Sequence, residues 1–208
     1  TGSDFIVPQP ARLSVSPTAN SAQPALGKQV FHGLPFIIGK PVPDPSRCFI
    51  GFDPVKDNQQ HVTVPLGCKA RWIIFAHALL ESRVLQGEDI GRTVAYYVCR
   101  YRDADSVRLP VRERFEVSVV PTKFGQLPFL ARPDQMDYML PRHEGDWGNA
   151  GIRQLESQQG QPHSYYLWAW MNPHPDNIIQ SITVEPNERK FLVSAITLGH
   201  LDEEPFFR

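Results

Sequence analysis

Proline occurs 20 times in this chain of 208 residues, and the prolines are spread along its whole length. Proline has a fixed φ and no backbone N–H to donate, so it is excluded from the interior of a helix and from a central strand. So many prolines must separate many short elements. Short elements at frequent intervals are typical of strands, and the prolines therefore predict an all-β chain.

Eight segments have the alternation or the composition of strands. In 92–102 the residues Val94, Tyr96 and Val98 alternate with Ala95, Tyr97 and Cys99, as the two faces of a strand do. The segment 69–80 holds a run of aromatic and β-branched residues typical of a buried strand. About eight or more antiparallel strands at regular spacing predict a β-sandwich or jelly roll. The eight segments are 28–36, 60–66, 69–80, 92–102, 107–120, 163–171, 178–184 and 191–198.

The expected organisation is one β-sandwich domain over residues 28–208. Residues 1–27 are rich in Ser, Pro, Ala, Thr and Gln, which predicts a linker or strap, with a first edge strand at Asp4–Val7 as the alternative. The segment 122–160 predicts a long loop, and loops of that length are usually functional. The tail 201–208 ends in apolar residues, as if the chain packed on or continued into another domain.

Charge and cysteine content narrow the classes of function. The net charge is −1 with both signs mixed along the chain, so a nucleic-acid partner is not expected. The longest apolar run, Trp72–Leu80, is too short to span a bilayer, so membrane insertion is not expected either. Cys48, Cys68 and Cys99 are an odd number without metal-ligand spacing, so at least one thiol is unpaired within the chain. With no initiating Met and no signal segment, we expect a mature or excised piece.

Several short segments follow one another in the order of motifs of a known domain family. They are His32–Phe36 (HGLPF), Val64–Ala70 (VPLGCKA), Phe75–Ala78 (FAHA), Tyr101–Asp103 (YRD), Leu109–Arg112 (LPVR), Trp170–Ile182 (WMNPHPDNIIQSI) and Phe191–Leu198 (FLVSAITL). Over residues 28–200 the chain resembles the galactose-binding-like β-sandwich domains attached to bacterial glycoside-degrading proteins. It departs from the pattern at Ala104, where the family has glycine, and in the segment 122–160.

The resemblance implies a jelly-roll fold and a secreted, periplasmic or cell-surface location in a larger bacterial polysaccharide-processing protein. It implies no particular ligand. The expected partners are a carbohydrate or an adjacent catalytic domain, and no cofactor is expected apart from a structural calcium ion.

Two groups of residues are candidates for binding a sugar. Trp147 lies with Asp146 and Asn149 in a polar, glycine-rich part of the long loop, where an aromatic ring can remain exposed for stacking. Trp168 and Trp170 share one face of their predicted strand with Tyr166, which gives either a carbohydrate platform or, as the stronger interpretation, core packing.

Two turns have mainly structural interpretations. Asn172, His174 and Asp176 lie among prolines after a strand, which predicts a corner whose side chains bind backbone groups rather than a ligand. Asp103 and Asp105 are spaced as alternate oxygen ligands of calcium, although a plain turn is the stronger interpretation.

An enzyme is the alternative from another class. A glycoside hydrolase or lyase would need paired carboxylates, and Asp134, Asp137, Glu144 and Asp146 of the long loop could supply them. Glu113 and Glu116 are expected to point to opposite faces of one strand, so they do not form a pair. The sequence therefore favours a non-catalytic module that binds carbohydrate or braces a catalytic domain. A protein–protein adaptor is the third option.

Overall fold

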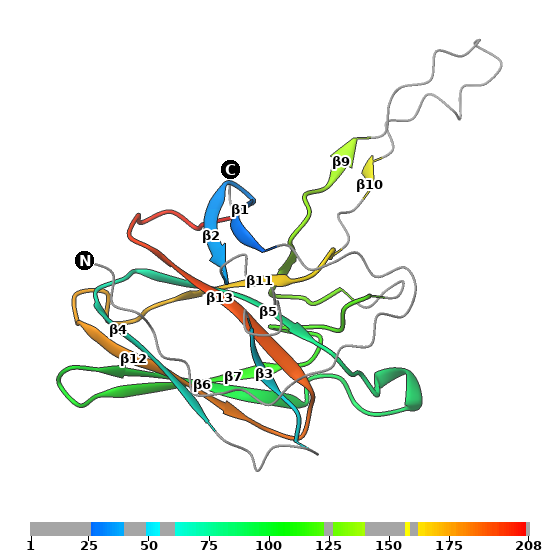
Figure 1. Ribbon diagram of the computed structural model, residues 1–208, viewed down its shortest axis with the longest axis horizontal. Helices are drawn as coiled ribbons and strands as arrows, with labels where there is room; N and C mark the ends of the chain where they lie inside the picture. The colour runs from blue at the N-terminus through cyan, green and yellow to red at the C-terminus, as the bar shows by residue number, and fades with distance from the viewer. Residues whose placement is uncertain are drawn as a thin grey trace, which may run out of the picture.

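The computed structural model describes residues 26–39, 49–54, 61–122, 127–139, 157–158 and 162–206. These residues form thirteen strands and the short 3₁₀ turn η2 (Val84–Gln86), with no α-helix among them (Figure 1). The strands are β1 (Gly27–Phe31), β2 (Leu34–Ile38), β3 (Ile50–Phe52), β4 (Val62–Cys68), β5 (Trp72–Leu79), β6 (Thr93–Tyr101), β7 (Ser106–Arg112), β8 (Arg132–Pro133), β9 (Tyr138–Met139), β10 (Ser157–Gln158), β11 (Tyr166–Met171), β12 (Ile179–Pro186) and β13 (Phe191–Gly199).

Two antiparallel sheets make up most of the fold. The five-stranded sheet has the order β3-β13-β5-β11-β8, and the four-stranded sheet has the order β4-β12-β6-β7. The main hydrophobic core draws on both sheets, with Phe75 of β5 and Trp168 of β11 on one side and Tyr97 of β6 and Val184 of β12 on the other. The predicted all-β, antiparallel sandwich is therefore confirmed.

The hairpin β1–β2 adds a third layer on the other face of the five-stranded sheet (Figure 1). Its two-residue turn, His32-Gly33, has φ of 50° and 77°, which is the type I′ geometry that matches the twist of paired strands. Phe36 of the hairpin packs in a second core with Ile74 and Leu167. β5 is thus buried on both faces, which explains why its sequence, apart from His77, is apolar rather than alternating.

The predicted strand 107–120 is wrong in its second half. β7 ends at Arg112, and residues 113–117 form a tight turn in which Arg114 has a φ of 69°. Val119 then bridges to Leu79 of the other sheet. The chain therefore changes sheets at this turn.

Several predicted regions lie outside the described residues in whole or in part. The described portion of the 1–27 segment begins at residue 26, and the alternative edge strand at Asp4–Val7 is not covered. Of the predicted long loop 122–160, the described residues include β8, the short pair β9–β10 and the segment leading to them. The tail is described to residue 206, where the ring of Phe206 contacts His32 at 5.9 Å between ring centres.

Candidate functional site

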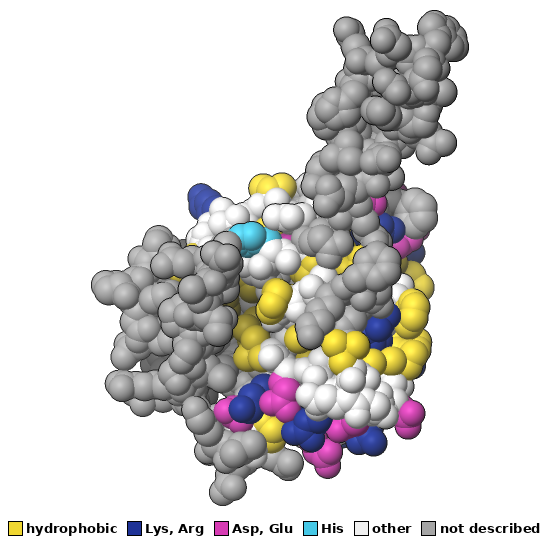
Figure 2. Space-filling view, turned by 90° about the vertical axis from the view of Figure 1, so that its right-hand side faces the viewer, with side chains coloured by type: hydrophobic (Ala, Val, Ile, Leu, Met, Phe, Trp, Pro, Cys, Tyr) yellow, Lys and Arg dark blue, Asp and Glu magenta, His cyan; other side chains and the backbone are white. Residues whose placement is uncertain are grey.

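A pocket of about 520 Å³ opens where the β1–β2 turn, the segment around β8 and the C-terminal tail meet. We call it the β8 pocket. The side chains that line the pocket and could contact a ligand include His32, Phe129, Arg132, Gln135, Met136 and Asp137. Figure 2 shows hydrophobic side chains in patches across the middle of one face of the molecule, with charged side chains of both signs gathered mainly along the lower edge of the view.

Phe129 is held in place by the turn 113–117. Its backbone N–H donates to the carbonyl oxygen of Arg114 at 2.9 Å, and its ring lies 5.3 Å from that of Phe115. The Arg114 guanidinium lies 5.6 Å from the centre of the Phe129 ring. The Phe129 side chain is nevertheless 63% exposed, so a fixed aromatic ring is presented to solvent.

His32 ties the hairpin to β8 and to the tail. Its Nε2 lies 2.7 Å from the carbonyl oxygen of Pro133, and because a carbonyl can only accept, Nε2 is the donor. The guanidinium carbon of Arg132 lies 6.0 Å from the centre of the Phe206 ring, which His32 meets edge-on. Three segments far apart in sequence are thereby joined around the pocket.

These groups are suited to binding a polyhydroxylated ligand. An open aromatic ring can stack against the apolar face of a sugar, and planar amide, guanidinium and carboxylate groups can exchange hydrogen bonds with its hydroxyls. Phe129 was not among the residues selected from the sequence. The criterion applied to Trp147, an aromatic residue in a polar, glycine-rich segment, does not find Phe129, because its neighbours in residues 127–133 are mostly apolar.

The tryptophan face of β11 does not form a platform. Trp168 is 8% exposed and stacks on Phe75 at 5.5 Å inside the main core. Trp170 is half-buried against the same core. Of the two interpretations of this face, core packing agrees with the burial of Trp168 and Trp170, because alternation along β11 turns the face toward the opposite sheet. Trp147, Asp146 and Asn149 lie outside the described residues.

The corner after β11 is organised by Asn172, which is 2% exposed. Its Oδ1 accepts from the Tyr101 hydroxyl at 2.5 Å and from the His174 N–H at 3.0 Å. Its Nδ2 donates to the carbonyl oxygens of Ala70 at 2.7 Å and of His174 at 3.1 Å. The His174 ring packs edge-on against Tyr101 at 5.4 Å, and Asp176 is exposed. Asn172 uses its full hydrogen-bonding capacity within the fold.

Two of the carboxylates considered for catalysis serve the fold instead. Asp134 is 6% exposed and accepts backbone N–H groups of residues 163–165 at 2.6, 2.8 and 3.1 Å. Glu116 is 3% exposed and accepts three hydrogen bonds from Arg112, one from its backbone and two from its guanidinium. Asp137 is exposed at the β8 pocket, whereas Glu144 and Asp146 lie outside the described residues.

Glu113 differs from the expected strand geometry as well. It is 1% exposed at the end of β7, and its Oε1 has no hydrogen-bond partner among the described residues. Glu113 and Glu116 are thus both buried. They belong to a turn, and not to opposite faces of one strand as expected.

The turn between β6 and β7 is held by the Asp103 side chain, which bonds within the turn and to the segment before β12. Asp103 Oδ2 accepts from Asn177 Nδ2 at 2.7 Å, and Asp103 Oδ1 accepts from the Asp105 N–H at 3.4 Å. Ala104 between them has a φ of 73°, a conformation that favours glycine. Within the described ranges no group of three His, Cys, Asp or Glu residues could hold a metal ion.

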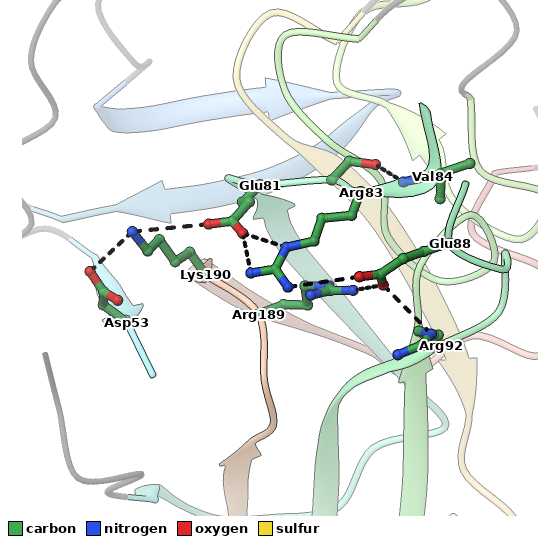
Figure 3. Close-up of polar contacts among 9 residues, drawn as sticks. Asp53, Glu81, Arg83, Val84, Glu88, Arg92, Arg189 and Lys190 are labelled. Carbon is green, nitrogen blue, oxygen red and sulfur yellow. Dashed lines mark hydrogen bonds and ion pairs between the residues drawn. The ribbon is translucent and has the colours of Figure 1, made fainter. Parts of the chain in front are cut away.

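A network of ion pairs closes the end of the sandwich near η2 (Figure 3). Glu88 lies at its centre, with Arg83 at 3.7 Å, Arg92 at 3.6 Å and Arg189 in closer contact. The Arg189 side chain is only 4% exposed. A second branch joins Lys190 to Asp53 at 3.6 Å. The network fastens the β5–β6 loop to the β12–β13 turn, so its role is structural.

We expect Glu88→Gln to lower the free energy of unfolding by about 2 kcal/mol, because it leaves the buried Arg189 without its charge partner. Glu185→Gln is the matched control. Its partner Arg108 is 55% exposed, so that loss is expected to be below about 1 kcal/mol. Urea denaturation of the two variants measures the difference, and equal losses would contradict the structural role of the network.

No family model matches this chain, and neither a curated protein nor a solved structure matches it. The family resemblance of the motifs therefore stays a prediction. Among the residues that the structure describes, no helix has the length and apolar character needed to cross a membrane.

Proposed function

We propose that this protein is a non-catalytic carbohydrate-binding module of the jelly-roll, galactose-binding-like type. In this proposal it serves a larger bacterial polysaccharide-processing protein that is secreted, periplasmic or on the cell surface. It binds glycan at the β8 pocket, with Phe129 as the stacking residue and Arg132, Gln135 and Asp137 as partners for sugar hydroxyls.

The observation that carries the proposal is the exposure of Phe129. An aromatic side chain that is 63% exposed while its backbone is fixed by a hydrogen bond is unusual for a residue that only packs. It lies in a pocket that also holds charges of both signs, as a binding site for a neutral hydroxylated ligand would. Of the four carboxylates of the hydrolase alternative, Asp134 is committed to hydrogen bonds that maintain the fold, which weakens that alternative.

Bracing of a neighbouring domain is the second candidate function, and the outer face of the β1–β2 hairpin favours it. Val30 is 70% exposed and Ile37 is 68% exposed, and they lie diagonally across the two strands. Exposed apolar side chains that lie together mark interaction surfaces. This surface is separate from Phe129, so the two candidates can be tested by different substitutions.

We expect Phe129→Ala to weaken glycan binding about fivefold to thirtyfold, since the loss of one stacking ring costs about 1–2 kcal/mol. A glycan array first identifies the ligand, and isothermal titration calorimetry then gives the Kd. Trp147→Ala is measured in parallel, because the sequence predicts a second stacking residue there.

Leu85→Ala is the control, because Leu85 is 64% exposed and lies on η2, outside the pocket. It should leave both the Kd and the melting temperature unchanged. Absence of binding to any glycan on the array, or unchanged binding by Phe129→Ala, would refute carbohydrate recognition at this pocket and leave the bracing role.

A further inference from the structure

The outer face of the four-stranded sheet carries a second depression, of about 650 Å³, which we call the sheet groove. It runs across β4, β12 and β6 on the side of the sheet that faces away from the main core. Its polar lining consists of His61, Thr63, Arg100, Gln180, Thr183 and Glu185, with Ser181 beneath them. The groove shares no lining residue with the β8 pocket.

Strand register arranges these side chains in rows across the sheet. Ser181 of β12 pairs with Pro65 of β4 on one side and with Arg100 of β6 on the other. Thr183 likewise lies between Thr63 and Val98. Because alternate residues of a strand share a face, both rows point outward while Ile182 and Val184 fill the core.

A β-bulge shapes one end of the groove. The register of β12 shifts between Ile179 and Ser181 against both of its neighbours. Against β6 the extra residue is Gln180, whereas against β4 the extra residue lies on β4, between Pro65 and Cys68. Bulges redirect side chains and are frequent beside binding sites. Here the bulge brings the Gln180 amide into the same depression as the Ser181 hydroxyl.

Most of the polar groups in the groove are not used by the fold. The Thr63 and Thr183 hydroxyls bond one another at 2.9 Å, and Glu185 is paired with Arg108 at 3.0 Å. Among the described residues, Arg100, Gln180 and Ser181 make no side-chain hydrogen bond or ion pair. Ser181 is nevertheless only 8% exposed, which places its unpartnered hydroxyl on the floor of the depression.

The charge pattern identifies the class of ligand. The Glu185 carboxylate is neutralised by its ion pair with Arg108. Among the described residues that line the groove, Arg100 therefore carries the one permanent charge that has no ion-pair partner. Its guanidinium matches a carboxylate or sulfate group, and the remaining hydroxyl and amide groups match sugar hydroxyls. The apolar lining residues among those described are Pro65 and Val98, so a peptide would find few anchor pockets for apolar side chains.

We propose that the sheet groove is a second binding surface that takes an extended acidic glycan, with Arg100 binding its carboxylate or sulfate group. The two sites of the molecule then differ in specificity, neutral sugar at the β8 pocket and acidic sugar at the sheet groove. The second site does not depend on the first.

The full chain is first screened on an array of uronate-bearing, sulfated and neutral oligosaccharides. It is then titrated with an oligogalacturonate and, for comparison, with the same oligosaccharide after its carboxyl groups have been reduced to alcohols. We expect the chain to bind the acidic oligosaccharides of the array, and the relative affinities show whether a carboxylate or a sulfate group is preferred. Arg100→Gln should weaken that binding about tenfold to a hundredfold. Arg102→Gln, which removes the same charge from an exposed position in the adjacent turn, should change it less than about twofold.

Each contrary outcome overturns the inference. The first is that no acidic glycan binds, and the second is that Arg100→Gln and Arg102→Gln lose the same affinity for the acidic glycan. The third is that an oligoglutamate peptide binds as tightly as the acidic glycan, which would show charge attraction alone. Phe129→Ala separates the two sites, because it should leave acidic glycan binding intact. Backbone amide shifts on titration should cluster on β4, β12 and β6, and both arginine variants should keep the wild-type melting temperature.

Discussion

Replacing Asn172 with alanine is expected to lower the free energy of unfolding by about 3 kcal/mol. The substitution removes four hydrogen bonds and leaves the Tyr101 hydroxyl and the Ala70 carbonyl without this partner in a buried position, and the His174 N–H without it in a partly buried one. The His174 carbonyl loses one bond and keeps that from the Asn177 N–H at 3.0 Å. Each stranded buried polar group costs about 1–3 kcal/mol, reduced where water or local relaxation can reach it. Chemical denaturation followed by tryptophan fluorescence measures the loss.

Two further substitutions locate the source of that loss. Tyr101→Phe removes only one of the four bonds and should cost about 1 kcal/mol. Asn177→Ala removes an exposed side-chain bond to Asp103 in the same segment and should cost below about 1 kcal/mol. If Asn172→Ala were no worse than Asn177→Ala, the corner would not depend on the Asn172 amide.

The fold could be predicted from the sequence where the pattern is local. The prolines and the alternation in 92–102 indicated strands, and the apolar run in 69–80 indicated a buried strand. The third layer could not be predicted, because the hairpin β1–β2 pairs only with itself and reaches the five-stranded sheet through side-chain packing. The end of β7 at Arg112 was missed because the Glu113–Val117 turn has no glycine or proline to mark it.

The candidate sites were predicted less well than the fold. A tryptophan in a strand can face either way, and the sequence could not tell that the side of β11 bearing Trp168 meets Phe75 and Tyr97. The sheet groove depends on the pairing of β4, β12 and β6, whose residues are separated by long stretches of sequence, and on a bulge at Gln180. Neither the pairing nor the bulge has a sequence signal of its own.

His77 is expected to make the protein lose stability in acid. It is fully buried on β5, where Nε2 donates to the Glu116 carbonyl at 2.8 Å, so the neutral ring accepts from the Tyr97 hydroxyl through Nδ1 at 2.8 Å. Burial lowers the pKa of His77 from 6.5 to about 4, although the hydrogen bond to Glu116 acts in the opposite direction.

The direction of the pH effect on stability follows from the pKa of His77 in the unfolded and in the folded chain. The unfolded chain takes up a proton on His77 near pH 6.5 and the folded chain only near pH 4, so protonation favours unfolding between these values. The contribution of His77 to stability is complete above pH 6.5 and is lost as the pH falls. The loss is expected to reach about 2 kcal/mol at pH 5 and about 3 kcal/mol at pH 4.

His77→Gln isolates this contribution, because glutamine offers a donor and an acceptor but does not titrate. Unfolding free energies of the wild type and the variant at pH 7.5, 6, 5 and 4 should converge as the pH falls, since carboxylate titrations are common to both. Parallel curves would show that His77 is not the acid-sensitive group.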